Sequence, residues 1–241
     1  MKNGQNSTRY SGVSRYRLCY NVENRHTEVK GMANKKKIPN ATMKRLPLYY
    51  RYFKQEEHNG NDRVSSREIS EALDIDSATI RRDFSYFGEL GRKGYGYNIG
   101  SLLKFFMEHI QGNDVKNVIL AGAGNLGSAL LNYKFANIHD KMNVVGAFDS
   151  NESLVGKTIN DIEIFHVNDM EQIINQENVE VAIMTVPMEA GQETAERLEA
   201  AGIKGILNFT PIRLNVSPDV TVHSIDLGVE LQALFFQMKI K

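Results

Sequence analysis

Three glycines near the middle of the 241-residue chain have the spacing of a phosphate-binding loop. They follow the pattern G-x-G-x-x-G, directly after an apolar run that starts at Val118 and directly before an apolar helical pattern. In such a loop the first glycine makes the turn, the second lets the backbone approach a pyrophosphate, and the third lets the helix pack close to the strand. Free N–H groups at the helix N-terminus then attract phosphate. The pattern predicts a dinucleotide-binding loop formed by Gly122, Ala123, Gly124, Asn125, Leu126 and Gly127.

A carboxylate follows this loop at the distance expected of a ribose-binding residue. Asp149 comes 22 residues after Gly127, directly after the predicted strand Asn143–Phe148. At that place a carboxylate can accept hydrogen bonds from ribose hydroxyls and repels a 2′-phosphate. This favours NAD(H) over NADP(H). The alternative interpretation of Asp149 is an ordinary turn residue before Ser150.

Two further predicted strands end in polar residues followed by proline. These segments are Thr185-Val186-Pro187 and Asn208-Phe209-Thr210-Pro211. Ligands of open α/β sheets bind at the carboxyl ends of the strands. We therefore expect the nicotinamide half of the cofactor to be lined by Thr185, Val186, Pro187, Asn208 and Phe209. Ordinary strand termination is the alternative for each of them.

The motifs of a hydride-transfer enzyme are not found, although such an enzyme needs a positioned acid or base. No motif pairs a histidine with a carboxylate at His109, His139, His166 or His223. Arg197 and Arg213 form no recognisable substrate clamp. The single cysteine, Cys19, excludes a cysteine-based zinc site, and we expect no metal. An NAD-dependent oxidoreductase with an accessory basic domain is nevertheless the main alternative class.

Charge divides the chain into two unlike halves. Residues 1–100 carry 19 Lys/Arg and 11 Asp/Glu, a net charge of +8, while residues 101–241 carry 10 and 18, a net charge of −8. Such asymmetry indicates a basic half that meets a polyanion. Chance segregation of surface charge is the alternative.

The basic half has the pattern of a winged helix-turn-helix. One helix is predicted over Ala41–Glu57, a second is capped by Ser65 or Ser66, and a third runs over Ala78–Leu90. Arg81 and Arg82 lie near the N-terminus of the third helix, the end from which recognition helices read bases. The predicted hairpin Gly91–Tyr97 alternates glycines with cations and tyrosines, as a wing that touches phosphate or enters a minor groove can do.

A set of polar residues on these elements is expected to contact double-stranded DNA. They are Lys44, Arg45, Ser66, Thr79, Arg81, Arg82, Ser85, Tyr86, Arg92, Lys93, Tyr95 and Tyr97. The alternative is that the arginines of the third helix only solvate an amphipathic surface.

These patterns predict an α/β chain of four parts. Residues 1–37 are expected to be a disordered basic arm, and residues 38–112 a winged-helix domain that ends in a linker helix over Ile99–Ile110. Residues 113–223 alternate strands and helices, as a Rossmann-type doubly wound parallel sheet does. Residues 224–241 are a final helix.

The final helix is apolar nearly all round. One stripe is formed by Leu227, Leu231, Leu234, Phe235 and Met238, and Val229, Phe236 and Ile240 lie off it. One domain surface covers only one stripe, so we expect this helix to pack against a partner subunit as in a domain swap. A groove of its own domain is the alternative. No window holds 18 apolar residues, and we expect a cytoplasmic protein.

Six segments taken in order resemble the Rex family of redox-sensing transcriptional repressors. They are Ile38–Arg51, Ser77–Gly88, Gly94–Asn98, Gly122–Gly127, Thr185–Pro187 and Gly205–Pro211. The resemblance implies a homodimer with swapped C-terminal helices that binds a palindromic operator and senses the NADH/NAD⁺ ratio. It further implies that NADH binding releases the operator and derepresses genes for fermentation and anaerobic respiration.

The charge of the cofactor suggests how its redox state is sensed. Oxidised nicotinamide is positive and reduced nicotinamide is neutral, so an apolar, dry pocket favours NADH. We expect Leu231 or Phe235 of the other subunit to supply the apolar cover, and Asp226 to couple to Arg45 of the DNA-binding domain. Coenzyme A is an alternative ligand of such domains. Asp149 argues against it, because coenzyme A carries a 3′-phosphate on its ribose.

Overall fold

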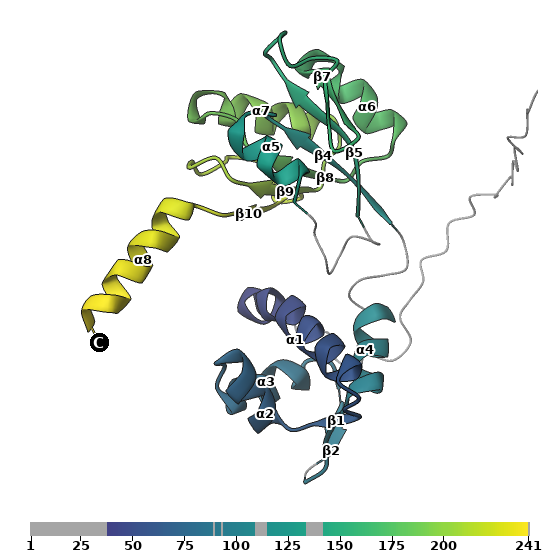
Figure 1. Ribbon diagram of the computed structural model, residues 1–241, viewed down its shortest axis with the longest axis vertical. Coiled ribbons are helices and arrows are strands. Elements are labelled where there is room, and N and C mark those ends of the chain that lie inside the picture. Colours follow the sequence, from purple (N-terminus) through teal and green to yellow (C-terminus); the bar gives the residue numbers. More distant parts are fainter. Residues whose placement is uncertain (1–37, 89, 93, 109–114, 134–141, 241) are drawn as a thin grey trace, which may run out of the picture.

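The structure, a computed structural model, describes residues 38–88, 90–92, 94–108, 115–133 and 142–240 (Figure 1). The predictions that lie outside the described residues include the arm 1–37, the wing residue Lys93 and the domain boundary between 112 and 113. The described residues form an N-terminal winged-helix domain and a C-terminal Rossmann-type domain, each with its own hydrophobic core.

The N-terminal domain has four helices and a small antiparallel sheet in which β3 is central. Its elements are α1 (Asn40–His58), β1 (Arg63–Val64), α2 (Ser66–Leu73), α3 (Ser77–Ser85), β2 (Gly91–Arg92), β3 (Gly96–Asn98) and α4 (Ile99–Phe106). Sequence signals place two of the helix starts. The Ser65 side chain accepts from the Glu68 N–H and Glu68 accepts from the Ser65 N–H, a capping box, while Asp76 caps α3.

The predicted recognition helix is shorter than the sequence pattern indicated. It ends at Ser85 and not at Leu90. Gly88 has a φ of 93°, a left-handed conformation that ends the helix, and Leu90 packs against the core from outside it. The expected core face is nevertheless present, since Ile80 and Phe84 are buried.

Helix α4 belongs to the core of the N-terminal domain and does not serve only as a linker. Its apolar face buries Ile99, Leu102, Leu103 and Phe106. These side chains share one cluster with residues of α1, among them Phe53, whose ring meets that of Phe106 edge-on with 6.0 Å between centroids. The continuation to Ile110 lies outside the described residues.

The C-terminal domain is a seven-stranded sheet in the order β10-β9-β8-β4-β5-β7-β6. Its strands are β4 (Lys116–Ala121), β5 (Met142–Asp149), β6 (Thr158–Ile159), β7 (Ile162–His166), β8 (Val181–Met184), β9 (Gly205–Asn208) and β10 (Thr221–Ser224). All neighbours pair in parallel except β6 and β7. From β7 to β10 this is the Rossmann order, in which the two halves of the sheet diverge between β4 and β8.

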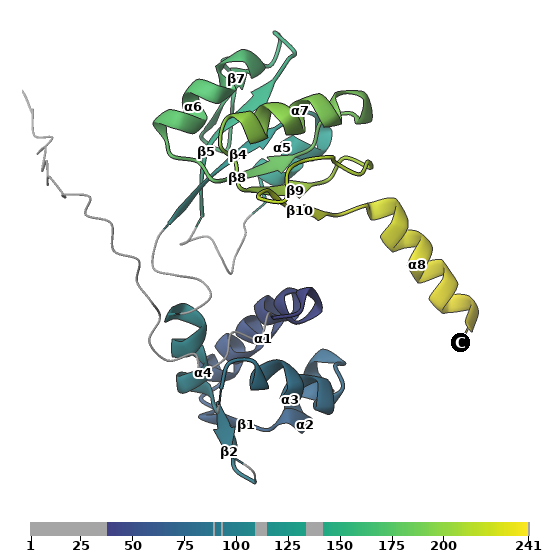
Figure 2. The ribbon, with the colours of Figure 1, turned by 180° about the vertical axis from the view of Figure 1, so that it is seen from behind.

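Helices cover both faces of this sheet (Figures 1 and 2). They are α5 (Asn125–Leu131), α6 (Met170–Gln176) and α7 (Met188–Ala200), with a 3₁₀ turn at Val167–Asp169. Alternation along β4 explains the two layers. Ile119 packs in the cluster of α6 and α7, whereas Leu120 packs in the cluster of α5. The glycine loop therefore follows β4 at the point where the chain turns toward the face of the sheet that α5 covers.

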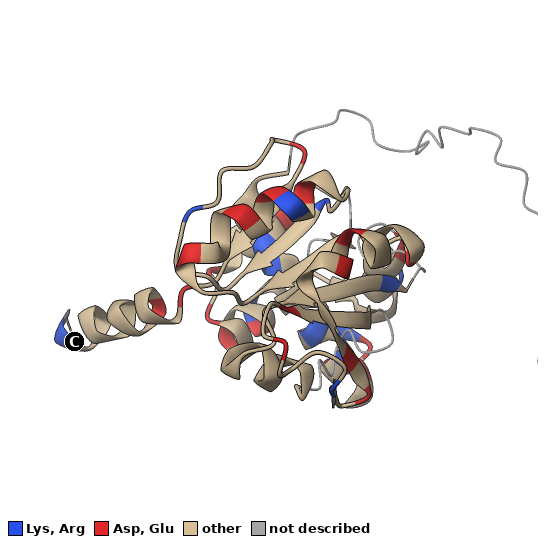
Figure 3. Cartoon of the chain, turned by 90° about the horizontal axis from the view of Figure 1, so that it is seen from above, with Lys and Arg blue, Asp and Glu red and all other residues tan. Residues whose placement is uncertain are grey.

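The last helix, α8 (Leu227–Ile240), projects from the sheet domain (Figures 1 and 2). It starts three residues later than predicted, because Ser224 is the end of β10 and Asp226 caps the helix by accepting from the N–H groups of Gly228 and Val229. Figure 3 shows that its charged residues lie only near its two ends. Leu231 and Phe235 are 51% and 54% exposed, so the alternative of a groove in its own domain is wrong.

Among the described residues, no helix has both the length and the apolar character that a membrane crossing requires.

Candidate cofactor and DNA-binding sites

The three glycines of the loop have three different surroundings. Gly122 has a φ of 96°, and a Cβ there would come within 2.9 Å of the Thr185 backbone. A Cβ at Gly127 would overlap the Gly122 carbonyl, which explains how α5 approaches β4 so closely. Around Gly124 a Cβ would meet nothing within 4 Å. The first and third glycines are required by packing, and the second faces open space at the N-terminus of α5.

Side chains at the ends of the two strands that flank β4 hold the loop in place. The Asp149 Oδ2 accepts a hydrogen bond from the Ala123 N–H at 2.8 Å, and its Oδ1 accepts from the Asn151 N–H at 2.8 Å. Directly after β8, the Thr185 hydroxyl donates to the Gly122 carbonyl at 2.6 Å. An ionised carboxylate can accept about four hydrogen bonds, so Asp149 keeps capacity for ribose hydroxyls.

A cavity of about 250 Å³ opens beside the loop, at the carboxyl ends of β4 and β5. Four of the predicted residues line it: Gly122, Asp149, Val186 and Pro187. Sequence reasoning missed its other wall, where Ala190, Glu193, Thr194 and Arg197 of α7 stand at i, i+3, i+4 and i+7. That spacing marks one helix face and could have been read from the sequence. Arg197 donates to the Val167 carbonyl at 2.8 Å and thereby closes this side.

Three residues predicted at the nicotinamide end, Thr185, Asn208 and Phe209, do not line this cavity. Asn208 is fully buried; its Oδ1 accepts from the Thr210 N–H, and its Nδ2 donates to the Ile212 carbonyl and the Ser224 hydroxyl. Phe209 packs against the cluster on the α5 side. Asn208 thus shapes the loop after β9. A second cavity of about 480 Å³ lies between that loop and the start of α8, lined by Thr210–Leu214, Val222 and Ser224–Asp226.

The recognition helix α3 presents its predicted polar residues to solvent. Arg81, Arg82 and Ser85 are exposed, whereas Thr79 and Tyr86 are half-buried. Arg81 donates to the hydroxyls of Ser66 and Ser77 at 3.2 Å, which places Ser66 of α2 next to it. A groove of about 540 Å³ runs between α3 and the wing, and its walls include Ser66, Arg81, Ser85 and Tyr97.

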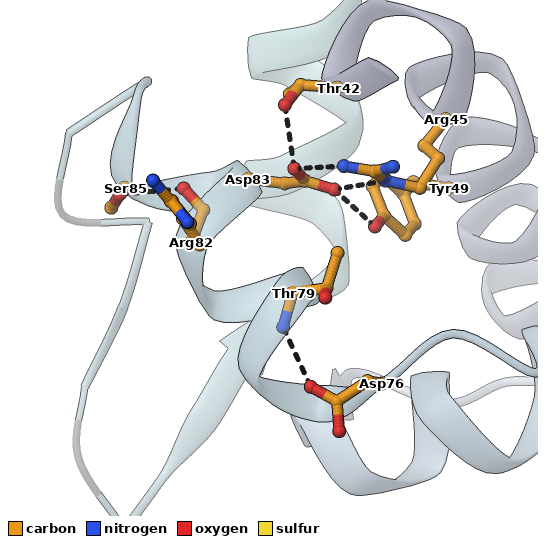
Figure 4. A network of polar contacts seen from close by, with 8 residues as sticks. All are labelled: Thr42, Arg45, Tyr49, Asp76, Thr79, Arg82, Asp83 and Ser85. Carbon is orange, nitrogen blue, oxygen red and sulfur yellow. Dashed lines mark hydrogen bonds and ion pairs between the residues drawn. The ribbon is translucent and has the colours of Figure 1, made fainter. Parts of the chain in front are cut away.

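A buried carboxylate joins the recognition helix to α1 (Figure 4). Asp83 is 2% exposed and accepts from the Thr42 hydroxyl at 2.8 Å, from the Tyr49 hydroxyl at 2.7 Å, and from Nε and Nη2 of Arg45 at 2.7 Å each. Burial by itself raises the pKa of Asp83, but the hydrogen bonds from Arg45, Tyr49 and Thr42 outweigh it and leave this pKa below its usual value. Burial and the hydrogen bond to Asp83 also raise the pKa of Tyr49.

This network changes the interpretation of Arg45, which was predicted both to bind DNA and to couple to Asp226. Its guanidinium is held in a bidentate ion pair with Asp83, and its side chain remains 26% exposed. Asp226 caps α8 in the same chain. Within the described part of one chain, each of the two residues thus has another partner. Lys44, one position earlier, is exposed on α1.

The wing divides its two tyrosines between different environments. Tyr97 is half-buried, its ring meets that of Phe84 edge-on at 4.9 Å, and burial raises its pKa. Tyr95 is 68% exposed. The backbone of Arg92 lies in β2, next to the wing tip. Of the two tyrosines, Tyr95 is therefore the more accessible to a ligand, while Tyr97 packs against Phe84 of α3.

Comparison with known proteins follows the same division of the chain. A family model described as "Putative DNA-binding protein N-terminus" matches residues 37–85, and one described as "CoA binding domain" matches residues 113–212. The redox-sensing transcriptional repressor Rex of Staphylococcus haemolyticus is 56% identical over 206 residues, which are 86% of this chain and 97% of that protein. The chain belongs to the Rex family of redox-sensing transcriptional repressors. The Rex repressor of Staphylococcus aureus strain Newman, 52% identical over 208 residues, covers the same share of the chain.

Solved structures of a Rex-family repressor named RSP have the same fold. Its complex with β-NAD⁺ and operator DNA is 36% identical, covers 85% of this chain and 94% of its own, and has a TM-score of 0.78. Its complex with β-NADH is 35% identical, covers 85% and 95%, and has a TM-score of 0.75. The expected fold, a winged helix followed by a Rossmann-type sheet, is thereby confirmed.

Membership of the Rex family also decides between the two function classes. The relatives are named as transcriptional repressors, so the chain is a regulator of transcription and not an oxidoreductase. The domain type in the second family model includes coenzyme A-binding proteins, but the Rex relatives sense redox state.

Proposed function

We propose that this chain binds NADH and NAD⁺ at the loop Gly122–Gly127 and operator DNA through α3 and the wing, and that NADH weakens its hold on the operator. The observation that carries the proposal is the geometry of the loop. Gly122 and Gly127 are closed in by backbone, while Gly124 faces open space where a pyrophosphate meets the N-terminus of α5. The RSP complexes with β-NAD⁺ and operator DNA and with β-NADH support the pairing of these two ligands.

The cofactor is expected to lie across the end of the sheet. Its adenosine half occupies the cavity beside Asp149. Val186 and Pro187, which the sequence pattern assigned to the nicotinamide half, line this same cavity and are therefore assigned to the adenosine half. The pyrophosphate lies against Gly124 and the backbone of Asn125. Thr185 and the loop that Asn208 shapes then stand toward the nicotinamide half. Asp149 is assigned to the ribose and disfavours NADP(H), since a 2′-phosphate would meet its carboxylate.

Discrimination between the two redox states is assigned to the partner subunit. We propose a homodimer in which α8 of one chain covers the nicotinamide site of the other with apolar side chains such as Leu231 and Phe235. Both are half-exposed in the single chain. Exposed apolar side chains of this kind indicate a surface that binds a partner. A dry cover disfavours the positive ring of NAD⁺, and a difference of about 1.4 kcal/mol already gives a tenfold preference.

For DNA binding we assign base and backbone contacts to the exposed face of α3, the start of α2, α1 and the wing. These residues are Lys44, Ser66, Thr79, Arg81, Arg82, Ser85, Tyr86, Arg92, Lys93 and Tyr95. Arg45 and Tyr97 are assigned to the support of α3. Two recognition helices of a dimer must lie about 34–36 Å apart to read one face of the duplex, so a rotation between subunits is enough to release DNA.

The experiment that tests the proposal is a titration of operator binding at fixed salt. The probe is a duplex that the protein itself selects from a random pool in the presence of NAD⁺. We expect NADH to weaken operator binding. The same concentration of NAD⁺ should leave operator binding nearly unchanged. Linkage requires that saturating DNA weaken NADH binding by the same factor. Equal operator affinity with both cofactors contradicts the redox-sensing proposal.

Asp226 is proposed to carry the signal to Arg45 of the partner subunit, which requires that Arg45 leave Asp83. The replacement Asp226→Asn keeps the helix cap and removes the charge. We expect this variant to bind NADH with unchanged affinity in a fluorescence titration and to lose most of the effect of NADH on operator binding. Glu230→Gln, on the first turn of the same helix, is the matched control. A full NADH response of the Asp226→Asn variant rules out the relay.

The remaining assignments are the division into residues 1–37, 38–112, 113–223 and 224–241, and a cytoplasmic location without a bound metal.

A further inference from the structure

The small sheet of the wing has one face toward the core and one toward solvent. Val64 of β1 pairs with Tyr97 of β3; Val64 is 3% exposed, and Tyr97 packs on Phe84. Side chains alternate along a strand, so the next pair in register, Arg63 and Asn98, belongs to the opposite face. Arg63 and Asn98 are both exposed. This solvent side is called here the outer face of the wing.

A cation lies over an aromatic ring on this outer face. The guanidinium carbon of Arg63 is 5.8 Å from the centroid of the Tyr95 ring. This distance is within the range of a cation–π interaction, and a guanidinium also stacks well on an aromatic plane. The ring orients the guanidinium and leaves its N–H groups free to reach an anion.

The charge of Arg63 is not neutralised by its surroundings. Among the described residues Arg63 takes part in no ion pair, whereas its near neighbour Arg67 is paired with Glu71 at 2.8 Å. A groove of about 510 Å³ lies beside the pair and is lined by Arg63, Tyr95, Asn98 and Ser101 and by Leu90, Gly91 and Gly96. The first four of these residues carry polar groups that can contact a charged ligand.

The hairpin residues Leu90, Gly91 and Gly96 border both this groove and the one between the wing and α3. The outer face is therefore continuous with the DNA-binding surface proposed above. A wing whose tip enters a minor groove has a sugar–phosphate backbone on each side of it. One backbone runs toward the recognition helix, and the other runs along the outer face.

We propose that the outer face of the wing is a second phosphate-contact surface, in which Arg63, stacked on Tyr95, binds the backbone that flanks the operator half-site. This inference rests on the proposed DNA-binding mode of the wing. It adds a residue that the sequence pattern did not mark, because Arg63 stands before the helix-turn-helix and 32 positions before Tyr95. Only the pairing of β1 with β3 brings the two together.

The test is the salt dependence of DNA binding by the full chain and its Arg63→Gln variant. Each phosphate contact contributes about 0.9 to the slope of log K against log salt. We expect the variant to lose about 0.9 of slope for each bound subunit, equivalent to about fivefold weaker binding per subunit at 0.15 M salt. Arg63→Lys keeps the charge and most of the slope. Lys54→Gln removes one charge from an ion pair on α1 and is the matched control.

The ring is tested by Tyr95→Leu, alone and together with Arg63→Gln. We expect Tyr95→Leu to weaken binding with little change of slope, and Arg63→Gln to cost less in that background than in the unchanged chain. An equal cost in both backgrounds overturns the stacking. A slope unchanged in the Arg63→Gln variant overturns the phosphate contact and leaves Arg63 as a brace of the wing. Both positions are exposed, and equal thermal unfolding of the variants verifies their fold.

Arg81→Gln on α3 separates failure of this inference from failure of the proposed function. If Arg81→Gln weakens binding and Arg63→Gln does not, only the outer face has been assigned wrongly. If neither variant changes affinity or slope, the DNA-binding surface on α3 and the wing is itself wrong.

Discussion

At the scale of single residues, the glycines of the loop fall into two groups: two are required by the fold, and one is required only by a bound ligand. The sequence pattern assigned one task to each glycine, and the structure agrees for Gly122 and Gly127, whose Cβ positions are taken by backbone. Gly124 has an ordinary φ of −65°, and, apart from its chain neighbours, no atom of the protein lies within 4 Å of the place that a Cβ would take. The task assigned to it, close approach of a pyrophosphate, needs a ligand to become visible.

This difference leads to opposite expectations for two alanine variants. Gly127→Ala forces a Cβ into the Gly122 carbonyl and should lower the free energy of unfolding by about 1–3 kcal/mol, the usual cost of overpacking. Gly124→Ala should unfold like the unchanged chain but bind NADH at least tenfold more weakly. Urea unfolding and a fluorescence titration with NADH measure the two effects. Unweakened NADH binding by Gly124→Ala contradicts the placement of the pyrophosphate.

The roles that could not be predicted from the sequence are those of residues whose contacts depend on tertiary neighbours. Asn208 follows the same strand-end pattern as Thr185, yet the first is buried under its own loop and the second holds the glycine turn. The carboxylate of Asp149 was expected at the ribose, but its bond to the Ala123 N–H, which joins it to the loop, follows from the pairing of β4 with β5. Local spacing carries no information about such contacts.

At the scale of elements, the starts of α2 and α3 were predicted better than the end of α3. The side chains of Ser65 and Asp76 accept hydrogen bonds from the first N–H groups of α2 and α3 and so cap these helices. Such caps are local interactions, so the sequence pattern can predict them. The end of α3 depends on Gly88, which adopts a left-handed conformation while Leu90 returns to the core. An apolar residue at helical spacing therefore misled the prediction.

The most consequential link between elements is Asp83, which joins α1 to α3. Its pKa is lower in the folded chain than in the unfolded chain, so its contribution to stability is present above the unfolded pKa and is lost as pH falls through the folded one. We expect the N-terminal domain to lose stability below about pH 4. Asp83→Asn should remove this dependence and destabilise by about 3–5 kcal/mol at pH 7, because Arg45 loses its partner.

Urea unfolding at several pH values, followed by tyrosine fluorescence, measures this effect. Glu180 provides the comparison: ion pairs with Lys204 and Lys116 lower its pKa to about 2, but these three side chains lie at the surface. Salt should therefore screen the contribution of Glu180 and leave that of Asp83 nearly unchanged. An acid stability profile that Asp83→Asn does not alter contradicts the assignment.

At the scale of the whole molecule, α8 is the feature that a single chain leaves incomplete. Its exposed apolar residues include Leu227, Val229, Leu231, Leu234, Phe235, Phe236 and Met238. The sequence predicted both this helix and its need for a cover, because an all-round apolar pattern fits no single domain surface. In the proposed homodimer the covering surface belongs to another chain, so the order of residues in this chain does not identify it.

Replacing Phe235 by glutamate tests the proposed homodimer. Phe235→Glu places a charge on the apolar surface of α8 and should turn the dimer into a monomer at micromolar concentration. Operator affinity and the preference for NADH over NAD⁺ should fall together, since both are assigned to the dimer. Analytical ultracentrifugation and cofactor titrations measure this, with Gln237→Glu as a control of equal charge. A dimer that persists in Phe235→Glu contradicts the role of α8.

The unequal surroundings of the three loop glycines also bear on how this kind of protein can change over evolutionary time. Selection for a folded chain alone protects Gly122 and Gly127, but only selection for the ligand protects Gly124. A descendant that stopped sensing its cofactor would keep its sheet and its repressor domain, and its second loop glycine would be the first of the three to drift. Whether a descendant sequence keeps glycine at position 124 therefore indicates whether that protein still binds its cofactor.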